Sequence, residues 1–150
     1  MGNTDYIVHH WAGGNQYVVT WASMSSSNGS MDVGTPFPST TDLALGSGLF
    51  SDKSVHVFRP AGSDVQILVE GSNQATLTNA ASLQFAFASL TDPQGNGIQI
   101  PPSGQTTWIE AVLENIVYIR PRVTTTSFAG TNGATVHLLL SSVRSSRSGV

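Results

Sequence analysis

The sequence predicts an all-β fold: a single-domain antiparallel β-sandwich of jelly-roll-like type with extended N- and C-terminal arms. Apolar and β-branched runs of about four to eight residues recur along the chain, which is typical of strands. The 15 glycines and 7 prolines separate these runs and favour turns between them. Almost no segment shows the periodicity of an amphipathic helix, and a length of 150 residues fits one domain.

Strands are predicted where apolar side chains alternate with polar or small ones, because successive residues of a strand face opposite sides of a sheet. In chain order these segments are residues 16–21, 54–59, 65–70, 83–90, 98–100, 117–124 and 135–140. Residues 31–38 contain prolines, which cannot donate to a ladder, and therefore predict an edge strand or a long loop. Residues 107–112 fit either a strand or a helical turn, and a short helix could occupy 78–82.

Turn chemistry divides the predicted strands. The short link 61–64 predicts a hairpin between the strands on either side of it. Residues 92–97, with Pro93 followed by Gly95, and the segment 130–133 both predict turns. The predicted domain plan follows in chain order: an N-terminal arm at 1–15, a β-sandwich domain at 16–140 and a Ser-rich C-terminal tail at 141–150.

The alternation also predicts which side chains fill the core between the two sheets. These residues are Trp21, Val57, Ile67, Val69, Phe85, Phe87, Ile119, Val123 and Leu138.

Composition limits the class of function. Charged residues make up only 10% of the chain, against about 25% in ordinary soluble domains, so a partner can cover this surface with little desolvation of ions. We therefore expect a chain that packs beside copies of itself or another protein. A net charge of -3 with six basic residues argues against nucleic-acid binding.

Several kinds of chemistry are not predicted. The chain has no cysteine, which excludes disulfides, zinc-thiolate sites and thiol catalysis. Adjacent His9 and His10 point in opposite directions on an extended arm and cannot readily share a metal. His56 and His137 alternate with apolar residues, which fits half-buried positions. Without a Gly-x-Ser-x-Gly motif or any paired carboxylates beyond Glu110 and Glu114, no catalytic residue, metal or cofactor is predicted.

No apolar run has the length of a signal peptide or a membrane span, so we expect a protein made in the cytoplasm with no membrane partner.

Two groups of residues are predicted to contact a partner. Arg120 and Arg122 share one face of their strand on either side of a proline. They could pair within the fold, with Glu70, Glu110 or Glu114, or bind acidic groups of a partner.

The second group lies in the N-terminal arm. Tyr6, Ile7 and Trp11 are apolar side chains that are costly to leave in water on a monomer, so we expect them to bind a neighbouring subunit.

Five short motifs, in this order, resemble the head decoration (cement) proteins of tailed bacteriophages. They are Thr20-Trp21-Ala22, Lys53-Ser54-Val55-His56-Val57, Val69-Glu70-Gly71-Ser72-Asn73, Leu90-Thr91-Asp92-Pro93-Gln94-Gly95-Asn96 and Tyr118-Ile119-Arg120-Pro121-Arg122-Val123. The resemblance spans roughly residues 17–140. It implies a sandwich or jelly-roll virion protein on the capsid surface, made in the host cytoplasm. It also implies a homodimer or homotrimer that binds the major capsid protein and bridges neighbouring capsid subunits.

An alternative resemblance is to discoidin-like, galactose-binding sandwiches, through Gly71-Ser72-Asn73 and the Tyr118-Ile119-Arg120 strand. It implies a carbohydrate- or receptor-binding sandwich of a virion or tail. The chain departs from that pattern at 74–88, where no tryptophan offers a platform for a sugar.

Overall fold

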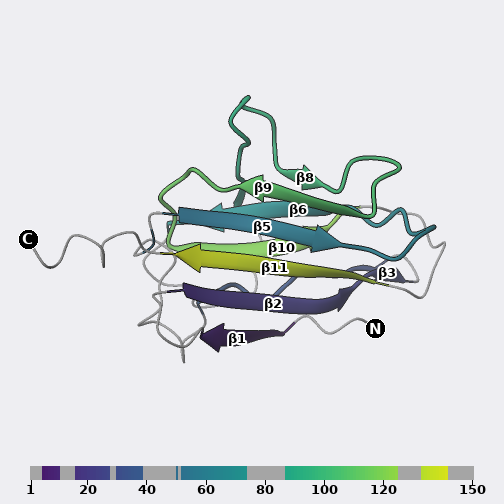
Figure 1. Cartoon of the computed structure of the whole chain (residues 1–150), viewed down its shortest axis with the longest axis horizontal. Coiled ribbons are helices and arrows are strands. Elements are labelled where there is room, and N and C mark those ends of the chain that lie inside the picture. Colours follow the sequence, from purple (N-terminus) through teal and green to yellow (C-terminus); the bar gives the residue numbers. More distant parts are fainter. Residues whose placement is uncertain are drawn as a thin grey trace, which may run out of the picture.

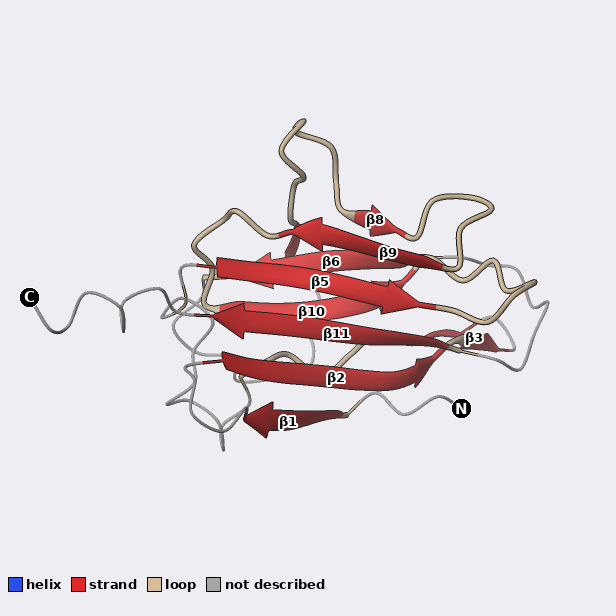
Figure 2. Ribbon diagram, viewed as in Figure 1, coloured by secondary structure: helices blue, strands red, loops and turns tan. Residues whose placement is uncertain are grey.

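The computed structural model describes residues 5–10, 16–27, 30–38, 50, 52–73, 87–124 and 133–141. These residues contain no helix, and their strands pair antiparallel. A five-stranded sheet lies over a four-stranded sheet, with a two-stranded ribbon at one end (Figures 1 and 2). The predicted all-β antiparallel sandwich is therefore confirmed.

The five-stranded sheet has the order β1-β2-β11-β5-β9. Its strands are β1 (Tyr6–His10), β2 (Gln16–Met24), β11 (Ala134–Ser141), β5 (Asp52–Phe58) and β9 (Thr107–Ala111). In the four-stranded sheet the order is β10-β6-β7, and β8 also pairs with β6. Its strands are β10 (Tyr118–Val123), β6 (Ile67–Ser72), β7 (Ala88–Ser89) and β8 (Gln99–Ile100). The ribbon pairs β3 (Ser26–Ser27) with β4 (Ser30–Met31).

Alternate residues of both sheets meet in one core, as the two-residue period of a strand requires. Along β11, for example, every second residue from Ala134 to Leu140 is buried. The predicted core residues confirmed as buried are Trp21, Val57, Ile67, Val69, Ile119, Val123 and Leu138. Phe85 lies outside the described residues.

The prediction for Phe87 is wrong. Its half-buried ring lies on the guanidinium of Arg120, 4.0 Å from the ring centroid to Cζ, and not between the sheets. The side chain of Arg120 points away from the inter-sheet core, and a cation attracts the electron-rich face of an aromatic ring. That contact holds Phe87 on the outer side of the four-stranded sheet.

The predicted hairpin around residues 61–64 is also wrong. The strands before and after this link are β5 and β6, and they belong to different sheets. Each strand buries one apolar face in the same core. Two strands can do this side by side in one sheet, as in a hairpin, or opposite each other in two sheets, as here. Arg59 fixes the crossing, because its backbone N–H donates to Thr106 O at 2.8 Å and its side chain donates to Val65 O.

Residues 6–10 do not form the predicted extended arm. They form β1, which pairs with β2 along its whole length from Tyr6↔Trp21 to His10↔Tyr17. The side chain of Tyr6 faces the core, where its ring makes edge-on contacts with Trp21 and Phe37 at 5.6 and 5.4 Å between centroids. Its neighbour Ile7 faces the opposite side, so the segment has the inward and outward alternation of a strand. Residues 6–10 are thus part of the sandwich.

Residues 33–37 run beside β10, which agrees with the expected edge segment. Isolated bridges join Val33 to Arg122 and Phe37 to Ile119. Gly34 is needed at this close approach, because a Cβ there would lie 2.7 Å from Pro121 Cδ. The indole of Trp21 reaches across the sandwich and donates to Thr35 O at 3.0 Å, which ties this segment to the five-stranded sheet.

Three further predictions concern residues 107–112, the turn at 92–97 and the segment 78–90. Residues 107–111 are strand β9, so Glu110 and Glu114 do not share a helix face. The turn at 92–97 is confirmed, with the Asp92 carboxylate accepting from the N–H groups of Gln94 and Asn96. The helix considered at 78–82 and residues 83–86 of the strand predicted at 83–90 lie outside the described residues.

Candidate protein-binding surfaces

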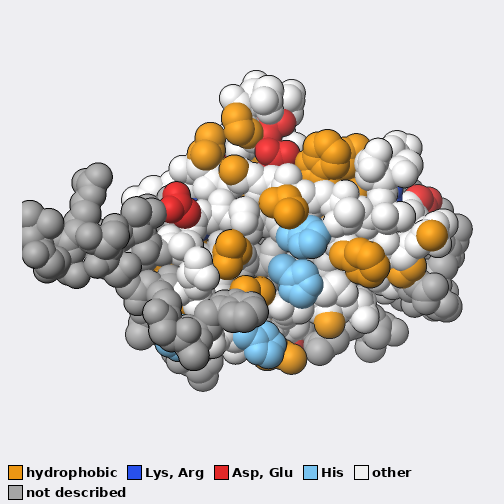
Figure 3. Space-filling view, viewed as in Figure 1, with side chains coloured by type: hydrophobic (Ala, Val, Ile, Leu, Met, Phe, Trp, Pro, Cys, Tyr) orange, Lys and Arg blue, Asp and Glu red, His pale blue; other side chains and the backbone are white. Residues whose placement is uncertain are grey.

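The outer sheet face is the side of the five-stranded sheet that points away from the core. By register and alternation its central members are Ile7 and His9 on β1, Val18, Thr20 and Ala22 on β2, Thr135, His137 and Leu139 on β11, Ser54, His56 and Phe58 on β5, and Thr107, Ile109 and Ala111 on β9. None of these central side chains carries a formal charge when histidine is neutral. A further row at one end of the face consists of Gln16, Ser141 and the carboxylate Asp52. Figure 3 shows hydrophobic and histidine side chains gathered across this face, with acidic side chains toward its margins.

Three large apolar side chains on the outer sheet face are strongly exposed. Ile7 is 60% exposed, Phe58 52% and Ile109 63%. They come from the two edge strands and from β5, so they span the sheet from one side to the other. Single exposed apolar residues are ordinary, but a spread of them on a face with uncharged central rows indicates a surface that binds another protein.

Histidines occupy the centre of the outer sheet face. His137 on β11 lies directly opposite His56 on β5, with 6.1 Å between ring centroids. Each ring shares a hydrogen bond with a threonine hydroxyl: His137 Nδ1 with Thr20 Oγ1 at 2.8 Å, and His56 Nε2 with Thr107 Oγ1 at 2.7 Å. These bonds fix both rings between apolar neighbours without adding a charge.

The pKa of His137 is lowered. Burial is the main cause, because it disfavours the charged ring, and repulsion from His56 and His9 adds to the effect. His137 is therefore neutral at pH 7, which keeps the centre of the face uncharged.

A second apolar surface lies at the rim, along the edge strand β9 and the loop that leads to β10. We call it the β9 rim, and it contains Trp108, 40% exposed, and Leu113, 65% exposed. Trp108 Nε1 donates to Glu110 Oε2 at 3.2 Å, which holds the indole against its own strand. The β9 rim is a different surface from the centre of the outer sheet face.

Glu114, in the same loop, has a structural role. Its Oε1 accepts from the N–H and the hydroxyl of Thr91, both at 2.6 Å. Burial acts to raise the pKa of Glu114, but the bonds from Thr91, a backbone hydrogen bond of Glu114 itself and the charge of Lys53 together lower it. The carboxylate therefore joins the loop before β10 to the turn at 92–97.

Arg120 and Arg122 both pair with Glu70 on the outer side of the four-stranded sheet. Arg120 Nε lies 2.9 Å from Glu70 Oε2, and Arg122 Nε lies 2.8 Å from Glu70 Oε1. The side chains of Arg120 and Glu70 are 8% and 7% exposed, whereas that of Arg122 is 34% exposed. The sequence left open whether the arginines pair within the fold or bind acidic groups of a partner. In the structure both of them pair within the fold.

The residues predicted to contact a partner are therefore placed differently. Tyr6 points into the sandwich, Ile7 lies on the outer sheet face, and Trp11 is outside the described residues. Arg120 is buried in the Glu70 pair. His56 and His137 are half-buried, as predicted. Sequence reasoning missed Phe58 and Ile109 as contact residues, and it missed the pairing of the two histidines, because only the register between strands brings these residues onto one face.

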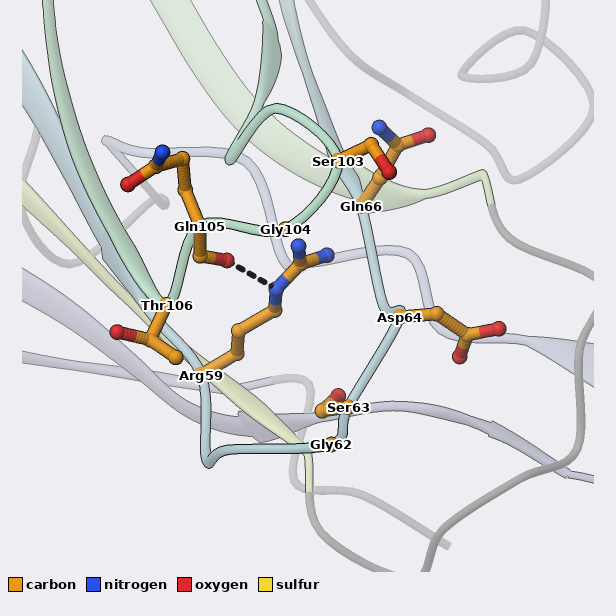
Figure 4. Close-up of a pocket in the computed structure, with 9 residues that line it drawn as sticks. All are labelled: Arg59, Gly62, Ser63, Asp64, Gln66, Ser103, Gly104, Gln105 and Thr106. Carbon is orange, nitrogen blue, oxygen red and sulfur yellow. Dashed lines mark hydrogen bonds between the residues drawn. The ribbon is translucent and has the colours of Figure 1, made fainter.

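An open polar hollow of about 430 Å³ lies between the loops at 59–66 and 103–106 (Figure 4). Its most buried charged group is Arg59, which donates to the carbonyls of Gln105 at 2.8 Å, Val65 at 2.8 Å and Pro102 at 3.1 Å. Arg59 thus clamps the two loops together. None of the nine residues around the hollow is aromatic, so it lacks the stacking platform on which a sugar would rest.

Among the described residues, no group of three or more His, Asp or Glu side chains is placed to hold a metal ion. In the same part of the chain, no helix has the length and apolarity to cross a membrane.

No protein-family model, curated protein or solved structure matches this chain.

Proposed function

We propose that the protein is a structural virion protein that decorates a phage capsid and stabilises it by bridging neighbouring capsid subunits. The observation that supports this most is the outer sheet face, where Ile7, Phe58 and Ile109 are exposed on uncharged central rows. Such a face is suited to protein contacts and offers no ionic grip to a nucleic acid. Its partners are the major capsid protein and further copies of the chain, on the capsid surface.

A bridging protein must hold more than one neighbour, and the described surface offers two separate places to do so. The outer sheet face is broad and lies on one side of the sandwich. The β9 rim presents Trp108 and Leu113 at the edge of the same sheet. One surface can therefore bind a capsid subunit while the other binds a different neighbour.

The capsid would be reinforced by the interface area that each bound copy buries and by the repetition of that contact over the shell. A specific interface buries about 1,200–2,000 Å², and icosahedral symmetry repeats that contribution over the shell. A head filled with DNA is under outward load, so each bridge adds contact that must break before the shell opens. The low charge of the chain keeps the desolvation cost of such contacts small.

The test uses phage heads assembled without this protein. Purified protein should co-sediment with them, saturate at a fixed number of copies per capsid subunit, and raise the temperature at which the heads release DNA. Leu113→Glu should weaken binding, because it places a charge on the β9 rim, whereas Gln94→Glu in the exposed 92–97 turn should bind like the wild type. Heads that take up no protein, or take it up without gaining stability, would contradict the proposal.

A further inference from the structure

The outer sheet face has a chemistry that suits contact with itself. Its rows of side chains run straight across the sheet, for example Ile7, Thr20, His137, His56 and Ile109 in successive strands. In a two-fold dimer each patch meets its own copy, so any formal charge near the axis would lie close to a like charge. The side chains of its central rows carry none when histidine is neutral, Asp52 lies in the end row, and the exposed isoleucines and Phe58 are apolar groups that can pack on one another.

The size of the face is sufficient for a specific contact. Five strands at a spacing of about 4.8 Å give a width of about 24 Å. Three rows of outward side chains, about 6.8 Å apart, give a length of about 20 Å. The two copies together would then bury on the order of 1,000 Å², counted on a flat sheet, which is about the smallest area expected of a biological interface and less than that of a standard one.

The histidines make this contact sensitive to acid. His137 and His56 lie at the centre of the face, opposite each other on β11 and β5, and His9 lies on the same face on β1. β2 and β9 contribute only uncharged residues to it, and Asp52, at the end of β5, is the carboxylate at its rim. Among the described residues no carboxylate lies in the central rows, so none of them would compensate a positive charge there.

We propose that the outer sheet face binds the same face of a second copy of this chain, and that the histidines on this face cause the two copies to separate in acid. At neutral pH the dimer covers Ile7, Phe58 and Ile109. At acid pH a positive charge on this apolar surface would face the same charge on the symmetric partner. The lowered pKa of His137 agrees with this arrangement, because its neutral form already prevails in the single copy at pH 7.

The proposal does not depend on capsid decoration, since it concerns the isolated protein. The dimer also leaves the β9 rim uncovered, so a capsid contact through Leu113 remains open to it. Failure of the dimer would leave the head-binding experiment unaffected, and failure of head binding would leave the dimer unaffected.

Sedimentation equilibrium at pH 7.5 and pH 5, over a concentration series, tests the proposal directly. The wild type should be dimeric at pH 7.5 and monomeric at pH 5. Ile109→Lys should weaken the dimer about a hundredfold or more at pH 7.5, because two copies of the charge enter the contact. Gln94→Lys, the matched change in an exposed turn, should leave the dimer intact. Circular dichroism and urea unfolding confirm that each variant is folded.

A triple variant, His9→Gln with His56→Gln and His137→Gln, separates the two parts of the proposal. It should remain dimeric at pH 5, because the amide carries no charge. A wild type that is monomeric at pH 7.5, a trimer, or a dimer that Ile109→Lys leaves unchanged would overturn the assignment of the face. A wild-type dimer that persists at pH 5 would overturn the role of the histidines.

Discussion

Replacing Glu70 by glutamine should destabilise the fold strongly, although the change is nearly isosteric. The Glu70 carboxylate is the shared acceptor for Arg120 at 2.9 Å and Arg122 at 2.8 Å. In Glu70→Gln one oxygen remains to accept from one arginine, and an N–H₂ group faces the other. The cluster then holds two positive charges without a compensating negative charge.

The structure sets the expected magnitude. Arg120 is buried, with a side chain 8% exposed, and removing one partner of a buried ion pair costs about 3–5 kcal/mol. Arg122 is 34% exposed, so water screens its share of the pairing, which is worth about 0–1 kcal/mol. We therefore expect Glu70→Gln to lower the free energy of unfolding by about 3–5 kcal/mol, nearly all of it through Arg120.

Urea denaturation measures this loss, provided the slope of the transition is unchanged. Arg122→Gln is the matched control, because it keeps the Glu70–Arg120 pair, and it should cost no more than about 1 kcal/mol. The double change Glu70→Leu with Arg120→Met should cost less than Glu70→Gln alone, since no buried charge is left unpaired. Equal losses for Glu70→Gln and Arg122→Gln would refute the reasoning.

Three further predictions concern the core, β1 and pH. Leu138→Ala should cost about 2–5 kcal/mol in urea unfolding, whereas Leu113→Ala at an exposed position should cost under about 1 kcal/mol; similar losses would contradict the burial. Deleting residues 1–15 removes β1 and the ring contacts of Tyr6, and should cost about 3–5 kcal/mol; an unchanged midpoint would mean that β1 is dispensable. Because the pKa of His137 is lowered in the fold, the unfolded chain binds its proton more readily, so stability should fall as pH drops below about 6.5. His137→Asn should flatten that fall, and a pH profile identical to the wild type would contradict the assignment.

The strands that sequence reasoning predicted best are those with strict alternation. The segments 16–21, 117–124 and 135–140 became β2, β10 and β11, with the expected faces inward, because the period of a strand fixes which side chains a core can take. Pairing was not predictable to the same degree. A short link such as 61–64 suits both a hairpin and a crossing between sheets, and the interactions of Arg59 with residues far along the chain distinguish them.

In the candidate surfaces, too, the strand that carries each residue was predictable, but the neighbours of that residue on other strands were not. The apolar character of Ile7 marked it as a contact residue, but its neighbours on the face come from strands distant in sequence. His56 and His137 could each be placed on a strand, yet their position opposite each other depends on the register of β5 and β11. Arg120 was ambiguous for a related reason, because its buried partner lies 50 residues away.

The most direct test of capsid decoration is the position of this protein in a purified phage particle, determined by electron microscopy. The proposal predicts sandwich-shaped density on the outside of the head, repeated with the capsid symmetry and touching two neighbouring capsid subunits. Density confined to the tail would contradict it and favour the receptor-binding alternative, and particles without any copy of the protein would contradict both.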